Sequence, residues 1–215
     1  MDASVKPGRR HGTPAPQART RRTRASVVDA ARWLFAERGY AATTIEAISE
    51  RSDTPQATIY RLFSSKLGIL KAVIDVAIVG DDDEIAMADR PQVQELLADP
   101  DPHQRLTRFA ALLRDLLERT APVHRLLADA ARSDPDAAAL LAEIARQRQE
   151  GQRRVARSLA RAGALRPELR ERDAADIIHA LASPEVYGLL VLDRGWSGER
   201  YEHWMGQTLR QQLLS

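Results

Sequence analysis

The chain has 215 residues, of which 44% are apolar, and a net charge of +2, so it can bury a core and suits two unequal domains. It has no Cys and only five scattered His, which excludes a disulfide framework and a thiolate metal site and predicts no metal and no cofactor. Its basic N-terminus lacks the apolar run of a signal peptide, and no segment approaches the roughly 20 apolar residues of a membrane span, so we expect a soluble cytoplasmic protein that does not enter a membrane.

Positive charge is concentrated at the N-terminus, where residues 1–24 hold seven Lys or Arg against one Asp. This segment is also rich in Pro, Gly and Thr, so we expect most of it to be disordered on its own and assign residues 1–20 to a basic arm. Such an arm can follow phosphates or enter the minor groove of DNA. The alternative is a solvated leader, and both remain open for the residues before Arg19.

A first helix is predicted from residue 27 onward. Apolar residues recur there at intervals of three and four, and Gly39 can end the helix because it can take a positive φ. We expect this helix and the two that follow to bury the same set of large side chains. These are Trp33, Leu34, Phe35, Ile45, Ile48 and Phe63.

Two short helices are predicted next. Thr43 and Glu46 have the spacing of a capping box, which predicts a second helix over residues 44–52. Pro55 suits the first position of a third helix, because its missing N–H would have no partner there, and this helix should end at Leu62.

The third helix divides its side chains between two roles. Ala57, Ile59 and Phe63 can pack back on the first two helices, whereas the other residues offer donors, acceptors and a methyl group. Gln can pair with adenine, Arg with guanine, and the Thr methyl can touch a thymine methyl. Thr44, Tyr60 and Lys66 are placed to hold phosphates. The predicted DNA-contact residues are Thr44, Gln56, Ala57, Thr58, Tyr60, Arg61 and Lys66.

Four sequence segments between residues 27 and 70 lie at fixed distances from one another. They are V-V-D-A-A-R-W-L-F-A-E-R-G-Y at 27–40, T-T-I-E-A-I-S-E at 43–50, T-I-Y-R-L-F at 58–63 and S-K-L-G-I-L at 65–70. Together they resemble the DNA-binding domain of TetR/AcrR-like transcriptional regulators. The resemblance implies an all-α fold in which a three-helix helix-turn-helix domain, residues 21–81, is joined through a fourth helix to a larger helical domain for ligand binding and dimerisation, residues 82–215.

The turn departs from the family pattern. Where the family usually has A-G-V-S, this chain has Ser52-Asp53-Thr54-Pro55. Asp is among the few non-glycine residues tolerated at positive φ, so we expect the turn to form. Leu62 stands where the family often has His, which predicts the loss of one phosphate contact.

The remainder of the chain also has helical periodicity. Helices are predicted to begin at Ser65, Pro102, Pro122 and Pro135, the last one ending at Gly163. The acidic run at 81–84 is predicted to be a solvated loop. No run of β-branched residues alternating with polar ones predicts a strand.

Two helices near the C-terminus carry apolar residues around much of their circumference. One spans 173–192, with Ser183-Pro184 expected to bend or restart it, and Ser197 caps the other. Packing against two-fold copies would give the four-helix bundle that the resemblance also implies, and the alternative is a core within one chain. A two-fold axis would place two recognition helices about 34–36 Å apart. The predicted dimer-interface residues are Ile178, Leu181, Val186, Leu189, Tyr201, Trp204, Met205 and Leu209.

A small-molecule effector in the C-terminal domain is implied by the same resemblance. Its candidate contacts, each of which can also be plain core, are Phe109, Leu113, His124, Leu127, His179 and Tyr187. Their mostly apolar character favours a hydrophobic or aromatic effector.

The chain contains no G-x-G-x-x-G, Walker A, G-x-S-x-G or H-E-x-x-H motif, so we expect no enzyme. The sequence favours a homodimeric repressor that binds a palindromic operator on double-stranded DNA and is released by an unknown small molecule. The alternative is an architectural DNA-binding protein that responds to no ligand.

Overall fold

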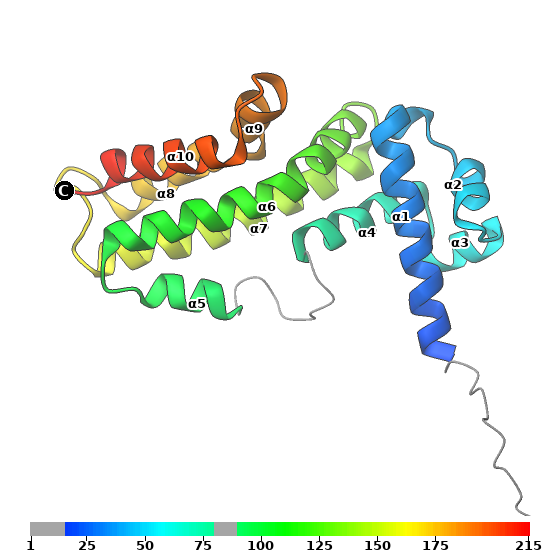
Figure 1. Cartoon of the computed structure of the whole chain (residues 1–215), viewed down its shortest axis with the longest axis horizontal. Coiled ribbons are helices and arrows are strands. Elements are labelled where there is room, and N and C mark those ends of the chain that lie inside the picture. The colour runs from blue at the N-terminus through cyan, green and yellow to red at the C-terminus, as the bar shows by residue number, and fades with distance from the viewer. Residues whose placement is uncertain (1–15, 80–89) are drawn as a thin grey trace, which may run out of the picture.

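The computed structural model describes residues 16–79 and 90–215, which fold into helices joined by short loops (Figure 1). The N-terminal part contains α1 (Pro16–Ala42), α2 (Ile45–Ser52), α3 (Gln56–Phe63) and α4 (Lys66–Val79). The larger part contains α5 (Pro91–Ala98), α6 (Pro102–Ala130), α7 (Pro135–Arg161), α8 (Glu171–Leu181), α9 (Pro184–Tyr187), the π-helical η2 (Gly188–Asp193) and α10 (Gly198–Leu213). The predicted all-α fold is confirmed. In Figure 1, α2 and α3 lie at one end of an elongated molecule and the C-terminus lies at the other.

The first helix, α1, is longer than the sequence predicted. It begins at Pro16, so residues 16–20, which the composition assigns to a disordered arm, are helical. The rest of that arm lies outside the described residues, as does the acidic run at 81–84. Gly39 has a φ of 77° and interrupts the helix near its end, as its lack of a Cβ allows.

The N-terminal domain is built on a core to which the C-terminal domain contributes. Phe35, Ile48, Ile59 and Ile69 bring the apolar faces of α1 to α4 together and are fully buried. The end of α6 and the start of α7 join this shared core through Val123, Leu127, Ala130 and Ala137. A movement of α6 or α7 therefore acts directly on the helices that carry α3.

Trp33 does not belong to this core, contrary to the prediction. Its side chain is 43% exposed, and the guanidinium of Arg51 lies 3.6 Å from the centre of its ring. Trp33 lies at the edge of the apolar stripe of α1, where the end of α2 brings a cation over the ring. A cation–π contact, worth roughly 0.5–1 kcal/mol at an exposed site, replaces the expected burial.

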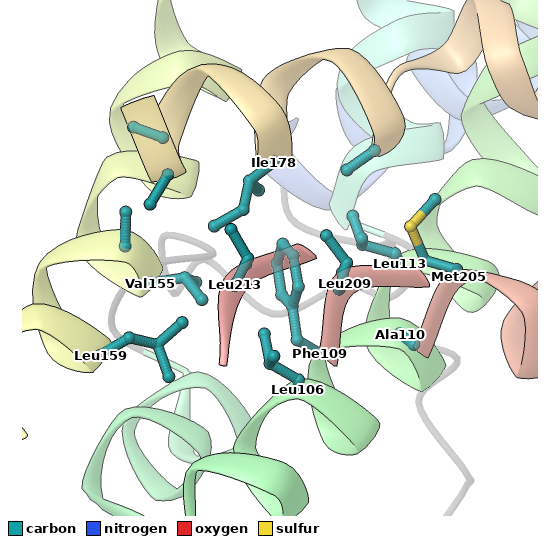
Figure 2. Packing of buried hydrophobic residues seen from close by; sticks show 14 of the residues in the cluster. Leu106, Phe109, Ala110, Leu113, Val155, Leu159, Ile178, Met205, Leu209 and Leu213 are labelled. Atoms are coloured by element: carbon teal, nitrogen blue, oxygen red, sulfur yellow. The ribbon is translucent and has the colours of Figure 1, made fainter. Parts of the chain in front are cut away.

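A second core fills the C-terminal domain between α6, α7, α8 and α10 (Figure 2). Phe109 and Leu113 of α6 lie against α10, while Val155 and Leu159 approach from α7 and Ile178 from α8. All five side chains are buried, so their packing fixes the four helices relative to one another.

The helix α6 runs without a break through Pro122, where the sequence predicted a new helix. Pro122 removes one backbone donor, which leaves the carbonyl of Glu118 without its usual partner. Both residues are exposed, so water can satisfy that carbonyl and the helix continues.

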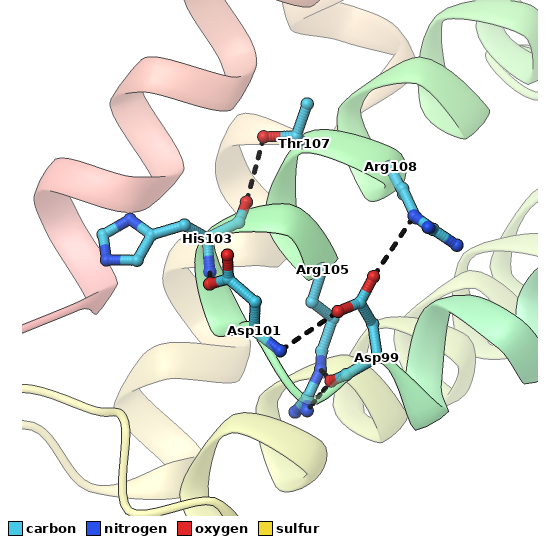
Figure 3. A network of polar contacts seen from close by, with 6 residues as sticks. All are labelled: Asp99, Asp101, His103, Arg105, Thr107 and Arg108. Carbon is cyan, nitrogen blue, oxygen red and sulfur yellow. Dashed lines mark hydrogen bonds and ion pairs between the residues drawn. The ribbon is translucent and has the colours of Figure 1, made fainter.

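Polar contacts set the start of α6 (Figure 3). Asp101 caps the helix, and its own N–H donates to Oδ1 of Asp99 at 3.0 Å. The other oxygen of Asp99 pairs with Arg108 at 3.2 Å. Arg105 is buried and donates to the carbonyls of Asp99 and of Ser158 on α7, so it ties this loop to α7. The preceding α5, which the sequence did not predict, buries only Leu96.

Three predicted helix boundaries in this domain are confirmed. Asp134 caps α7 by accepting a hydrogen bond from the N–H of Asp136 at 2.9 Å. Gly163 follows the end of α7 with a φ of 64°. Ser197 caps α10 by accepting from the N–H of Arg200 at 3.1 Å.

The segment Glu171–Asp193 is long and apolar enough to cross a membrane by length and composition, with a mean hydropathy of 1.3. In this fold it is divided into α8, α9 and η2. Ser183 restarts the helix by accepting a hydrogen bond from the N–H of Val186, as predicted. Ile178 and Tyr187 of this segment pack into the C-terminal core, and 39% of its apolar window is buried in the fold.

Candidate nucleic-acid interface

A tight turn joins α2 to α3 at Asp53. This residue has φ 49° and ψ 39°, in the left-handed region, and its N–H donates to carbonyls at the end of α2. The hydroxyl of Ser49 donates to the carbonyl of Thr54 at 2.7 Å and closes the turn. Pro55 is the N-cap of α3, so the helix begins at Gln56, one residue after the predicted start. Asp53 therefore preserves the helix-turn-helix, as predicted.

The predicted capping box at the start of α2 is wrong. Thr43 is fully buried, and its hydroxyl donates to the carbonyls of Leu34 and Gly39, so it holds the end of α1. Thr44 is the N-cap, and its Oγ1 accepts from the N–H of Ala47 at 3.1 Å. Burial of one of two adjacent threonines decides which of them caps the helix. Thr44 is exposed beside the first turn of α2, so its phosphate contact stays a prediction.

The recognition helix α3 has one buried side and one solvent side. The buried side consists of Ile59 and Phe63. The solvent side consists of Gln56, Ala57, Thr58, Tyr60 and Arg61, of which Thr58 is half-buried and the others are exposed. Ala57, which was expected both to pack inward and to contact DNA, lies next to Gln56 on the solvent side. The exposed face thus offers an amide, a hydroxyl, a phenol and a guanidinium within about two helical turns.

The position of α3 depends on contacts that were not predicted from the sequence. Arg24 of α1 donates to the carbonyl of Leu62 at 3.2 Å, and its guanidinium lies 4.6 Å from the ring centre of Phe63. Gly68 of α4 passes so close that an added Cβ would lie 1.9 Å from the carbonyl oxygen of Phe63. Ser64 ends α3 with a φ of 64°. The orientation of α3 is therefore set by α1 and α4 together.

Lys66 does not project freely toward a phosphate. Its Nζ donates to the carbonyls of Tyr40 at 2.8 Å, Thr43 at 2.9 Å and Ala41 at 3.4 Å. It also lies 4.3 Å from the ring centre of Tyr40, and burial lowers the pKa of its ammonium. All three ammonium donors are used, so Lys66 first of all holds the end of α1 against the start of α4. The predicted phosphate contact would have to displace these hydrogen bonds, so we expect a structural role for Lys66 instead.

Positive charge extends from the end of α3 along the first turns of α1. Arg19, Arg21 and Arg22 are exposed, and residues 17–28 contain no acid. Because Arg24 touches the last residues of α3, these arginines continue from that side of the helix-turn-helix. The arrangement can hold phosphates beside the reading face of α3.

The predicted effector residues do not form one site. Phe109, Leu113 and Tyr187 are buried in the C-terminal core, and Leu127 is buried in the shared core, so these side chains fill space and do not line it. His179 is half-buried, with its Nδ1 2.8 Å from Oε1 of Gln152. His124 lines a groove of about 520 Å³ between α6 and α7. The groove also contains Arg148, Glu185 and several alanines that the prediction missed, since these positions meet only through tertiary packing.

The predicted dimer-interface residues also separate into two groups. Ile178, Tyr201, Met205 and Leu209 are fully buried within the chain, because α10 packs along α6, and for these the intrachain alternative is correct. Leu181, Val186 and Trp204 are partly buried. Leu189 is 60% exposed, and Leu192, which the prediction did not include, is 41% exposed on the same π-helical turn.

Residues 27–73 match the sequence model of a family described as bacterial regulatory proteins, tetR family. YvkB of Bacillus subtilis, described as an uncharacterized HTH-type transcriptional regulator, is 39% identical over 54 residues. That match covers 25% of this chain and spans 29% of the length of YvkB.

The fold of the whole chain is similar to solved structures of regulators. SmeT of Stenotrophomonas maltophilia, in complex with triclosan, is 20% identical with a TM-score of 0.67 over 90% of this chain and 92% of SmeT. A transcriptional regulator of Saccharomonospora viridis in complex with choline is 21% identical, with a TM-score of 0.66 over 89% and 97% of the two chains. NalD of Pseudomonas aeruginosa, a secondary repressor of the MexAB-OprM efflux pump, is 18% identical, with a TM-score of 0.68 over 91% and 98%. At these identities the matches show a common fold.

Proposed function

We infer that this chain, which carries a TetR-family DNA-binding domain, is a cytoplasmic transcriptional repressor that binds a palindromic operator as a homodimer and releases it when a small molecule occupies the C-terminal domain. The observation that carries the proposal is the solvent side of α3. Ile59 and Phe63 anchor this helix in the core, so Gln56, Tyr60 and Arg61 are left free to meet a duplex. Regulators of this family bind DNA and are not enzymes.

Reading of the operator is assigned to the first turns of α3. A major groove admits one helix, in which Gln56 can pair with adenine, Arg61 with guanine, and the methyl of Thr58 can touch thymine. Thr44 at the start of α2 and Tyr60 would hold the backbone. The exposed arginines at the start of α1 would add affinity that depends on salt and carries little sequence information.

Selection of preferred duplexes from random DNA by the purified protein tests this assignment. We expect a palindrome with half-sites about one helical turn apart. Gln56→Ala should change the preferred base at one position of each half-site, whereas Gln212→Ala, an exposed residue on α10, should change none. Equal loss of affinity on all sequences would remove Gln56 from the reading face. Equal binding of palindromic and random duplexes, steeply dependent on salt, would identify an architectural DNA-binding protein instead.

Dimerisation is proposed through the surface around η2, since Leu189 and Leu192 leave apolar area uncovered there. Val186 and Trp204 contribute from α9 and α10, whereas the four fully buried residues support this surface from within. Leu189→Glu should shift the protein from dimer to monomer in analytical ultracentrifugation and abolish tight binding to the palindrome. Val76→Glu alters a residue of similar exposure, 56%, on α4 and should leave the dimer intact. A dimer that survives Leu189→Glu places the interface elsewhere.

Control by a small molecule is proposed because the fold is shared with proteins that bind such ligands. SmeT has been captured with triclosan and the Saccharomonospora viridis protein with choline. Repression is proposed because SmeT and NalD are both repressors. A coupling of about 1–3 kcal/mol between effector and DNA would suffice for a response of roughly 5- to 150-fold.

A further inference from the structure

The groove between α6 and α7 has the volume of a small-molecule site and is open to solvent, since Ala138, Ala142 and Glu185 on its walls are exposed. Its volume of about 520 Å³ falls in the range of roughly 300–1,000 Å³ that such sites occupy. Most of its lining is small and apolar, and consists of Ala128, Ala131, Ala138, Leu141, Ala142 and Ala145. Small side chains on facing stretches of two packed helices leave space that larger ones would fill.

One end of the groove, beside α9, is polar. The carboxylate of Glu185 lies 3.7 Å from Nε2 of His124 and 3.7 Å from a terminal nitrogen of Arg148. Both separations are longer than a normal hydrogen bond, and Nε of Arg148 is buried without an acceptor in the part of the chain that the structure describes. His179 is hydrogen-bonded to the side chain of Gln152 near this cluster. Arg132 is exposed at the opposite end of the groove. The polar end therefore has an unused donor, Nε of Arg148, beside the carboxylate of Glu185.

The same cluster carries no net charge at neutral pH. Burial lowers the pKa of His124 and of His179 below their ordinary value, so both rings are neutral. Burial also lowers the pKa of Arg148, but an arginine stays protonated, and its charge is balanced by the carboxylate of Glu185. A charged ligand head would upset this balance and would have to be desolvated without a matching partner.

The groove lies against the junction of the two domains. The stretch of α6 that supplies His124 and Ala128 to the groove supplies Val123 and Leu127 to the shared core on its other side. On α7, Leu141 lines the groove and also packs against that core. A molecule that separates α6 from α7 here must therefore displace side chains that support α1 and α4, because a packed core does not deform smoothly.

We propose that this groove is the effector site, and that its ligand is an uncharged ring compound whose hydroxyl group accepts a hydrogen bond from the guanidinium of Arg148 and donates one to the carboxylate of Glu185. The proposal rests on the proposed function, since it names the site and the chemical class of that effector. A hydroxyl both donates and accepts, so it satisfies both charged groups and adds no charge. The alanine walls accept the apolar ring. A carboxylate paired with Arg148 would leave Glu185 without its partner, and a quaternary ammonium beside Glu185 would do the same to Arg148.

Titration calorimetry of the purified full chain, without DNA, tests the ligand class. The probes are 1-naphthol, 1-naphthoate and a naphthyl trimethylammonium salt, which share a ring system and differ in their head group. We expect 1-naphthol to saturate one site per chain and to bind at least tenfold more tightly than the anion and the cation. Preference for either charged probe, or no saturation by 1-naphthol up to its solubility limit, overturns the class.

Variants of α7 test the location. Ala142→Phe fills the groove, and Ala139→Phe places the same side chain at an exposed position outside it. We expect Ala142→Phe to weaken 1-naphthol at least tenfold at an unchanged melting temperature and Ala139→Phe to have no effect. Arg148→Met keeps an apolar stem but removes the donors, and should weaken the probe about tenfold. Wild-type affinity in Ala142→Phe overturns the site. If that variant instead dissociates a dimer and keeps the probe, the groove is a subunit contact and the proposal falls.

The link to DNA is measured separately on a duplex selected by the protein. In the wild type, 1-naphthol should lower DNA affinity at least fivefold, and in Ala142→Phe it should change affinity by less than twofold. An equal response in the two proteins overturns the assignment of the effector to this groove. A protein that binds 1-naphthol but no DNA would overturn the proposed function and leave the groove as a ligand site, so the two failures are distinguishable.

Discussion

Replacement of Lys66 by Met distinguishes the two roles that its position permits. The variant keeps the apolar stem and loses hydrogen bonds to the carbonyls of Tyr40 at 2.8 Å and Thr43 at 2.9 Å, with a weaker one to Ala41. A hydrogen bond to a charged group contributes about 1.5–3 kcal/mol, but the side chain is half-buried and water can reach the freed carbonyls. We therefore expect a net loss of about 2 kcal/mol in unfolding free energy. For a chain of this length, that corresponds to a melting temperature lower by about 4–8 °C.

Calorimetric melting and salt-dependent DNA binding measure these roles independently. Each phosphate contact contributes about 0.9 to the slope of log K against log salt concentration. Because the ammonium is occupied by carbonyls, we expect the slope of Lys66→Met to equal that of the wild type. Lys71→Met is the matched control, since Lys71 is exposed on the same helix and pairs with Asp75 at the surface. It should lower the melting temperature by less than about 2 °C. An unchanged melting temperature with a slope shallower by about 0.9 would refute the structural role and restore the phosphate contact.

Three further perturbations follow from the packing. Gly68→Ala forces a Cβ to 1.9 Å from a backbone carbonyl of α3, so it should lower the unfolding free energy by about 2–3 kcal/mol and weaken DNA binding. Gly151→Ala on α7, where no described atom lies within 4 Å of the added Cβ, should raise the unfolding free energy by up to about 1 kcal/mol. Denaturant melts in which Gly68→Ala is the more stable variant would contradict the close contact. Tyr201→Phe removes a buried hydroxyl without a partner, so unfolding free energy should stay the same or rise by up to about 1 kcal/mol, and a clear loss means that the hydroxyl is bonded. Burial holds the pKa of His124 and of His179 below the value in the unfolded chain, so the unfolded state binds protons first as the pH falls. The unfolding free energy should therefore decrease as the pH drops below about 6.5. Equal urea midpoints at pH 7.5 and 5.5 would contradict this.

The helix-turn-helix was predictable from the sequence because its determinants are local. Gly39 at positive φ and Asp53 in the left-handed turn each act within a few residues along the chain, and so does Ser197, which caps α10 in the C-terminal domain. Their conformations follow from backbone sterics and short hydrogen bonds, which are readable at fixed spacing. The solvent side of α3 was predictable for the same reason, apart from Ala57, since Ile59 and Phe63 define the buried side.

The failures occurred where two elements compete for the same residue. Thr43 and Thr44 could both cap α2, and only burial of Thr43 against α1 decided the register. Lys66 could bind a phosphate or backbone carbonyls. In this fold the start of α4 lies close enough to the end of α1 for its ammonium to donate to the carbonyls of Tyr40 and Thr43. Pro122 reads as a helix start, but exposure of the affected carbonyl let α6 continue.

The sequence alone determined the helices, the turns and the solvent-side residues of α3, because neighbouring residues fix the backbone angles and the helix caps. Tertiary structure alone decided that Tyr201 and Met205 are covered by their own chain and that Leu189 is not. It also decided that His124, Arg148 and Glu185 meet at one groove, although they lie on three separate helices. The physical reason is that burial and charge pairing depend on which helices pack together, and helical periodicity specifies that a face is apolar without specifying which partner covers it.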